Sequence, residues 1–239
     1  MISEALNIDC MDYMVRFSDR FFDLAVVDPP YGIGANRLGY GQDTKARREF
    51  VEIKEKHWDK LPPPPEYFKE LMRVSKNQII WGGNYFSDRL PGSMGWIFWD
   101  KGTAPGFTKS AGELAWTSFG RRLEKFSYIW DGAHRSGEIG VKRIHPTQKP
   151  IALYKWILQR YAKPGDKILD THLGSGSSRI AAFDLGFDFY STELDKDYFD
   201  AQEERFNDYK AQALLFSPEE LRGGAGLSRM NKNNNGHAA

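Results

Sequence analysis

The sequence predicts an α/β protein built around one mostly parallel sheet with helices on both faces. The apolar run from Phe22 to Val27 stops at two prolines, which is typical of a central strand whose C-terminal end lies at a turn. From Ile151 to Tyr209, helical and strand patterns alternate, as they do where parallel strands are joined by right-handed crossovers. A chain of 239 residues suits one large domain, so we expect both halves to contribute strands to one sheet.

Four further strands are expected in the first half of the chain, each a short run of apolar and aromatic residues. They are placed at 77–81, 95–99, 113–119 and 126–130, and the last two are expected to form a hairpin-like pair. Their tryptophans are predicted to belong to the core rather than to stack on bases: Trp81, Trp96, Trp99, Trp116 and Trp130.

The second half begins with a helix over Ile151–Tyr161, where apolar residues recur at helical spacing up to Pro164-Gly165. A short strand over 167–170 follows, then a Gly/Ser turn and a helix from about Ser178 to Leu185. The pattern closes with a strand over 189–193 and a helix over 196–209. Together with the strands above, seven strands are expected.

Two segments lack such patterns. Residues 32–65 are polar and charged and end in a run of prolines, and a connection of this length is typical of a lid or a binding loop. Residues 221–239, rich in Gly and Asn, are expected to be a disordered tail. We therefore expect a single domain over residues 1–220.

Composition excludes several classes of protein. Lys+Arg 33 against Asp+Glu 32 gives a net charge of +1, so a nucleic-acid partner must be held by local basic patches. The single cysteine, Cys10, excludes a disulfide framework and a zinc site built from cysteines. The apolar runs are too short to span a membrane, and the first residues do not form a secretion signal. These observations predict a cytoplasmic protein with no membrane partner.

Asp28-Pro29-Pro30-Tyr31 follows the central strand, at the edge where open α/β sheets bind ligands. A proline-bounded turn with a partly buried tyrosine is the plain interpretation. The functional one is that the Asp28 carboxylate and the rigid Pro29 carbonyl offer two acceptors, with the flat face of Tyr31 beside them. Such a set is suited to hold a planar amine, for example the exocyclic amine of a base.

A second motif, from Asp170 to Ser177, joins a strand to a helix and contains Gly174-Ser175-Gly176. The glycines let a ligand approach the backbone, although a tight turn alone also explains them. The dinucleotide fingerprint needs a third glycine where this chain has Arg179, which argues against NAD or FAD. Glu193, about twenty residues on, is placed to bind ribose hydroxyls. The glycine turn and Glu193 together indicate a mononucleoside-type cofactor.

These motifs, in this order, resemble those of the DNA amino-methyltransferases that use S-adenosylmethionine. His145-Pro146-Thr147-Gln148-Lys149-Pro150 is similar to the segment that precedes the glycine strand in that family, and Asn7-Ile8-Asp9-Cys10 is similar to the strand end whose acid meets the adenine of the cofactor. The likeness runs from about Leu6 to Tyr209. It implies a Rossmann-like methyltransferase fold with a seven-stranded sheet and the circularly permuted motif order of the β group.

The resemblance also implies roles for individual residues. The catalytic set is Asp28, Pro29, Pro30 and Tyr31. The set that binds S-adenosylmethionine is Asp9, Cys10, Asp28, Thr147, Lys149, Asp170, His172, Gly174, Ser175, Gly176 and Glu193. The chain departs from the family pattern where Thr171 and His172 replace a Pro and an aromatic residue, and where Ile8 replaces a Gly. No metal site is expected.

The expected activity is methylation of the N6 amine of an adenine flipped out of double-stranded DNA and stacked on Tyr31. Cytosine-N4 methylation is the alternative, and a non-catalytic nucleoside- or DNA-binding module is a second one. Residues 32–65 are expected to face DNA, 100–145 to form a small target-recognition region, and the protein to be a monomer or a homodimer. Basic residues expected to contact DNA, rather than form a solvated face, are Arg37, Lys45, Arg47, Arg48, Arg135, Lys142 and Arg143.

Overall fold

The structure is a computed structural model that describes residues 1–34, 59–103, 110–130, 135–138, 141 and 143–215. Within these ranges the chain forms helices and strands in the following order: β1 (Ser3–Leu6), α1 (Cys10–Met14), β2 (Phe22–Val27), α3 (Pro65–Val74), β3 (Ser75–Trp81), the 3-10 helix η2 (Gly83–Tyr85), β4 (Trp96–Asp100), β5 (Gly112–Thr117), β6 (Glu124–Ser127), α4 (Ile151–Tyr161), β7 (Lys167–Asp170), α5 (Ser177–Leu185), β8 (Asp188–Thr192) and α6 (Lys196–Leu215).

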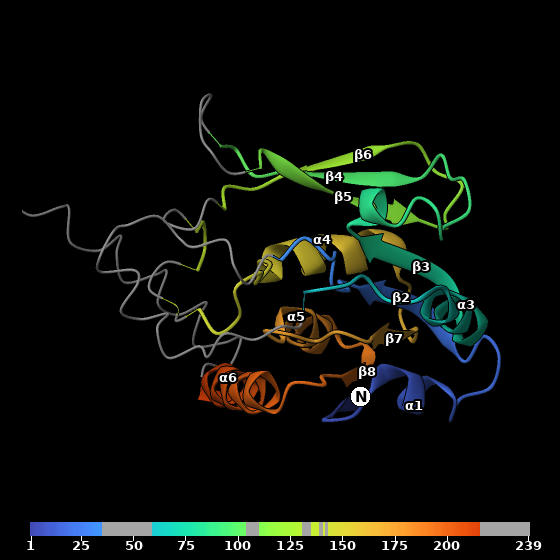
Figure 1. The fold of residues 1–239 in the computed structure, drawn as a ribbon. Helices are drawn as coiled ribbons and strands as arrows, with labels where there is room; N and C mark the ends of the chain where they lie inside the picture. Colours follow the sequence, from blue (N-terminus) through green and yellow to red (C-terminus); the bar gives the residue numbers. More distant parts are fainter. Residues whose placement is uncertain (35–58, 104–109, 131–134, 139–140, 142, 216–239) are drawn as a thin grey trace, which may run out of the picture.

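In the part of the chain that is described, eight strands form one sheet in the order β1-β8-β7-β2-β3-β5-β4-β6 (Figure 1). The five strands from β1 to β3 are parallel to their neighbours, and β5 is antiparallel to both β3 and β4. The predicted mostly parallel α/β architecture is confirmed. The strand beyond the seven expected is β1, whose four half-buried residues pair only with β8 and carry no continuous apolar run.

The predicted hairpin-like pair of strands over 113–119 and 126–130 is wrong. The second of these strands, β6, pairs in parallel with β4, while β5 lies between β3 and β4. Because β3 and β4 already occupy both edges of β5, the chain leaving β5 must cross β4 before its next strand finds a free edge.

Helices cover both faces of the sheet. On one face, Leu24 and Val26 of β2 pack with side chains of α4 and α5. On the other, Ala25 and Val27 pack with side chains of α1 and α3. Alternate residues of β2 thus bury both faces, which is why its sequence is continuously apolar from Leu24 to Val27.

Most of the predicted tryptophan core is confirmed. The side chains of Trp81, Trp99, Trp116 and Trp130 are buried. The side chain of Trp96 is partly buried against the core on the face of the sheet that α1 and α3 cover. Helix α3, which the sequence patterns did not single out, begins with Pro65 at its first position and buries Tyr67, Phe68, Leu71 and Val74. Within the described ranges, no helix is long and apolar enough to cross a membrane.

Candidate active site

The site lies at one edge of the sheet because β1, β2, β7 and β8 run parallel and end there. The chain turns away in opposite directions from β2 and β7, which are neighbours, so this edge is the switch point where open α/β sheets bind ligands. A cavity of about 480 Å³ opens at this point, a size in the range of small-molecule sites.

Most of the predicted cofactor residues line this cavity. They are Asp9, Cys10, Asp28, Thr147, Lys149, His172, Gly174, Ser175 and Glu193. Pro30 of the predicted catalytic set also lines it. Asp170 and Gly176, and of the catalytic set Pro29 and Tyr31, are not among the lining residues. The structure therefore brings together segments that are far apart in the sequence.

The glycine turn is held from two sides. Gly174 and Gly176 both have positive φ, +52° and +72°, which favours glycine, and α5 starts directly afterwards. The Glu193 carboxylate accepts hydrogen bonds from the N–H of Gly174 (2.8 Å) and of Asp195 (2.9 Å). From behind, Arg205 of α6 donates to the carbonyl of Ser175 at 2.7 Å. Sequence reasoning missed Arg205, since nothing near it in sequence marks it.

Arg205 also links the turn to residue 138. Its guanidinium lies 3.3 Å from a carboxylate oxygen of the buried Glu138, whose other oxygen accepts the N–H of Ile151 at the start of α4. Glu138 falls within the region expected to recognise the target, and its motif-free surroundings gave no signal for this contact. One buried ion pair thus connects that region, the glycine turn and α4.

Asp170, the last residue of β7, and His172 lie where the chain leaves β7 and enters the glycine turn. Asp170 is buried and accepts hydrogen bonds from Ser178 Oγ (2.5 Å) and the N–H of His172 (3.1 Å), and burial raises its pKa to about 7. Burial lowers the pKa of His172 to about 4, so its imidazole is neutral at pH 7. Thr171 Oγ1 lies 2.9 Å from His172 Nδ1 and 2.7 Å from the hydroxyl of Tyr67 in α3. Asp170 therefore supports the turn, while His172 faces the cavity.

The end of β1 is fixed against the end of β8. The side-chain amide of Asn7 donates to the carbonyls of Glu193 (2.7 Å) and Leu194 (3.0 Å). Asp9 caps α1 by accepting the N–H of Met11 at 2.7 Å. The thiol of Cys10 has its pKa raised to about 12, chiefly by burial, so it is protonated at pH 7.

At the tip of β2, the Asp28 carboxylate is engaged on both oxygens. Oδ1 accepts the Tyr31 hydroxyl at 2.7 Å, and Oδ2 accepts the ammonium of Lys149 at 2.5 Å. The same ammonium lies 3.0 Å from the carboxylate of Glu113, which also accepts a hydrogen bond from Lys101. Glu113 and Lys101 were missed by the sequence reasoning, because their position depends on the register of β5 and β4.

Burial and charge compete in this cluster. Burial raises the pKa of Asp28, and the Lys149 ammonium opposes that rise. For Glu113, burial also acts to raise the pKa, but Lys149 and Lys101 outweigh it and lower the pKa to about 2. Burial acts to lower the pKa of Lys149, yet the two carboxylates leave it raised. Lys149 is therefore a buried cation shared by two acids.

The ring of Tyr31 lies close to backbone and to a second ring. Tyr85 of η2 stacks on it with centroids 5.0 Å apart and an interplanar angle of 17°. A Cβ at Gly82 would come within 2.2 Å of the Tyr31 ring, so only glycine fits there. The ring is thus fixed against the end of β3.

The segment before α4 folds over the cavity mouth. The N–H of Thr147 donates to Nδ1 of His145 at 3.3 Å, and the His145 ring packs edge-on against Tyr198 with centroids 4.4 Å apart. Arg143 donates to the carbonyls of His145 and Pro146, so in this structure it braces the same segment. These contacts place Thr147 and Lys149 at the cavity.

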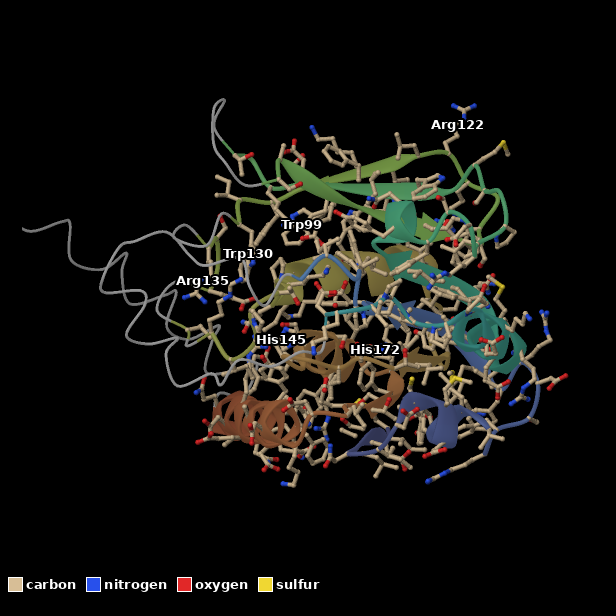
Figure 2. All side chains as sticks on the ribbon, in the orientation of Figure 1. Trp99, Arg122, Trp130, Arg135, His145 and His172 are labelled. Carbon is tan, nitrogen blue, oxygen red and sulfur yellow. The ribbon has the colours of Figure 1, made fainter. Side chains whose placement is uncertain are left out.

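The predicted DNA-contacting residues are only partly described. Arg37, Lys45, Arg47, Arg48 and Lys142 lie outside the described residues. Arg135 forms an isolated antiparallel β-bridge with Trp130, and its guanidinium carbon lies 5.9 Å from the centre of the Trp130 ring. Both residues lie on the same side of the molecule as His145 (Figure 2). Arg122 lies at the opposite end, because the antiparallel β5 carries the chain away from the cavity.

Comparison with known proteins agrees with the fold and the motifs. Residues 76–204 match the model of a family described as DNA methylase, the N6/N4 methyltransferases. The chain belongs to this family of S-adenosylmethionine-dependent DNA amino-methyltransferases. The predicted family, fold class and cofactor are confirmed, and DNA is the substrate class of the family.

Two curated relatives match over most of their length. The type II methyltransferase M2.DpnII of Streptococcus pneumoniae is 23% identical over 81% of this chain and 85% of its own. The type II methyltransferase M.HinfI of Haemophilus influenzae is 23% identical over 87% of this chain and 69% of its own. Both names place similar proteins among type II methyltransferases.

Two solved structures share the fold. The M1.HpyAVI–SAM complex superposes with a TM-score of 0.53 at 16% identity, covering 87% of this chain and 100% of that one. PvuII DNA methyltransferase, described as cytosine-N4-specific, superposes with a TM-score of 0.55 at 14% identity, covering 91% of this chain and 94% of that one.

Proposed function

We propose that this protein transfers a methyl group from S-adenosylmethionine to the N6 amine of adenine in double-stranded DNA. The observation that carries the proposal is the place of Asp28: its carboxylate lies at the tip of β2, lines the cavity, and is held by Tyr31 and Lys149. Asp rather than Ser at position 28 favours adenine, by resemblance to the family.

The residues at the cavity fit the cofactor. The Glu193 carboxylate, held by two backbone N–H groups, is suited to bind the ribose hydroxyls, and Asp9 to meet the adenine amine. Gly174 lets the ligand approach the backbone, and the neutral His172 offers a ring without charge. Thr147 and Lys149 also line the cavity. When bound there, S-adenosylmethionine supplies a methyl group on a positively charged sulfur.

The chain's contribution to the reaction is to orient the amine and to take up its proton. Asp28 and the Pro29 carbonyl accept the two N–H bonds of the flipped amine, so its lone pair is directed at the methyl carbon. The nitrogen–carbon bond forms as the carbon–sulfur bond breaks, and the electron pair of the broken bond remains on sulfur. Asp28 then accepts the extra proton of the methylated nitrogen. Tyr31 provides the face on which the flipped base stacks.

Cytosine-N4 methylation is the second candidate. The same acceptor pair suits the cytosine amine, and a protein of this fold is described as cytosine-N4-specific. For the DNA duplex, we propose that residues 32–65 face it, that 100–145 read the target, and that Arg135 is among the phosphate contacts.

The deciding experiment is to incubate the purified protein with methyl-labelled S-adenosylmethionine and DNA of mixed sequence. Digestion of the DNA to nucleosides and chromatography then identify the labelled product. N6-methyladenine is expected. Label in N4-methylcytosine would overturn the adenine assignment, and intact cofactor binding without any transfer would overturn the enzymatic one.

A further inference from the structure

Glu113 lies at the active edge of the sheet although it comes from the antiparallel part. Strand β5 pairs with β3 so that Ala115 is opposite Trp81, the last residue of β3. Two residues earlier on β5, Glu113 therefore extends beyond the end of β3, toward the turn that holds Asp28. Glu113 falls within residues 100–145, for which target reading is proposed above, but no role in cofactor binding or methyl transfer has been proposed for it.

The contacts of Glu113 converge on Lys149. The Lys149 ammonium has three N–H groups and three neighbours: Asp28 Oδ2 at 2.5 Å, Glu113 Oε2 at 3.0 Å and the Tyr31 hydroxyl at 3.3 Å. The Lys149 side chain is only 3% exposed, so water does not compete for these bonds. The other oxygen of Glu113 accepts a hydrogen bond from Lys101. Asp28, Lys149, Glu113 and Lys101 thus form a row in which negative and positive side chains alternate.

This arrangement presents an obstacle to the target amine. Both Asp28 oxygens are already hydrogen-bonded, and one of the donors is a full positive charge. A carboxylate oxygen can accept a second donor, but the ammonium on Oδ2 makes that oxygen a poorer acceptor for a neutral amine. Charge-assisted hydrogen bonds are roughly twice as strong as neutral ones, so the amine does not displace the ammonium unaided. For the Lys149 ammonium to leave Asp28, a second anion must be within its reach. The Glu113 carboxylate already contacts the ammonium.

We propose that Glu113 is a positioning residue for methyl transfer, which takes up the Lys149 ammonium when the target amine enters and so releases Asp28 Oδ2 to accept that amine. This inference rests on the proposed function, since it assumes that Asp28 binds the amine. The movement requires no new burial of charge, because all the groups are already together. Lys101 makes it feasible by keeping Glu113 ionised.

The coupling predicts opposite effects for two substitutions. Glu113→Gln leaves Lys149 with Asp28 as its sole counter-charge, which lowers the pKa of Asp28. Lys101→Met leaves Glu113 a stronger partner for Lys149, which raises the pKa of Asp28. The titratable groups that face Asp28 are Lys149, Glu113, Tyr31, Tyr154 of α4, Asp170 of β7 and Tyr67 of α3. Both substitutions leave the other groups in place.

The first measurement is a carboxyl-carbon NMR titration of the protein without DNA, with the Asp28 signal assigned by its loss in Asp28→Asn. We expect the Asp28 midpoint to fall in Glu113→Gln and to rise in Lys101→Met. Glu70→Gln is the matched control, because Glu70 is an acid of α3 that pairs with Arg73 of the same helix and does not line the cavity. Midpoints that move in the same direction in both variants, or in neither, would overturn the inference.

The second measurement is single-turnover methylation of DNA. Loss of a hydrogen bond to a charged group typically costs about 10- to 100-fold, and we expect a fall of about that size in Glu113→Gln, with cofactor affinity unchanged. Glu113→Asp should restore part of the rate, and Glu70→Gln should keep the wild-type rate. A Glu113→Gln rate within about twofold of wild type would refute the role of Glu113. If the wild-type protein transfers no methyl group to any DNA, the proposed function fails instead, and the inference fails with it.

Discussion

Gly82 supports the Tyr31 ring so closely that a single methyl group should disturb catalysis. Gly82 has φ of +71°, and a Cβ placed on it would lie 2.2 Å from Cε1 of Tyr31. Since ordinary carbon contacts begin at about 3.4 Å, the ring in Gly82→Ala must move by about 1.2 Å. Misplacement of about 1 Å can cost roughly 100-fold in rate. We expect a loss of kcat of that order, because the Tyr31 hydroxyl also holds Asp28.

Gly165→Ala separates this steric effect from backbone strain. Gly165 has φ of +88°, and a Cβ on it would meet nothing within 4 Å. Both variants should lose about 1–2 kcal/mol of stability from the left-handed conformation. Only Gly82→Ala should lose methyl transfer, measured with saturating S-adenosylmethionine and with cofactor binding followed by calorimetry. Wild-type kcat in Gly82→Ala would refute the proposed role of the Tyr31 ring.

Three further outcomes are expected. Asp28→Asn should lower single-turnover transfer by at least about 100-fold with an unchanged circular dichroism spectrum; retained transfer would contradict the role of Asp28. Glu193→Gln should weaken S-adenosylmethionine binding about 10- to 100-fold by calorimetry, since hydrogen bonds to charged groups contribute about 1.5–3 kcal/mol, and an unchanged Kd would exclude the ribose contact. The lowered pKa of His172, about 4 in the fold against 6.5 ordinarily, means that the unfolded chain gains a proton first as pH falls, so stability is lost between about pH 6.5 and 4. His172→Asn should lose less stability over this range in denaturant titrations, and equal losses would show that His172 is not responsible.

Much of the fold was predictable because its signals are local. Strand β2 is continuously apolar from Leu24 to Val27 and is followed by Asp28 and two prolines, and α4 carries apolar residues at helical spacing before Pro164. The strand ends of a parallel sheet meet at one edge, so Asp28 and Glu193 could be expected together once the strands were placed, and the resemblance to the family added Asp9. The cavity that these three residues line agrees with that reasoning.

What could not be predicted depends on register and on long-range pairing. Glu113 reaches Lys149 only because β5 inserts antiparallel between β3 and β4, and no residue in its strand encodes that choice. The same insertion made the predicted hairpin wrong. Arg205 of α6 supports the glycine turn although it lies 30 residues after Ser175 in the chain. In the sequence it has the pattern of a basic residue on the exposed face of a helix.

The pairing of β1 with β8 has a consequence for synthesis of the protein. Ile2 donates its N–H to Asp188, a contact that spans 186 residues, and Ser3 pairs with Phe189. As the chain leaves the ribosome, β2 and β3 can meet early, but the edge of β2 that β7 will cover stays open until the last third is made. Such distant contacts slow folding, and an open strand edge invites association with other chains. The half of the sheet that carries Glu193 thus closes last, and the open edge of β2 is most exposed to association with other chains during that interval.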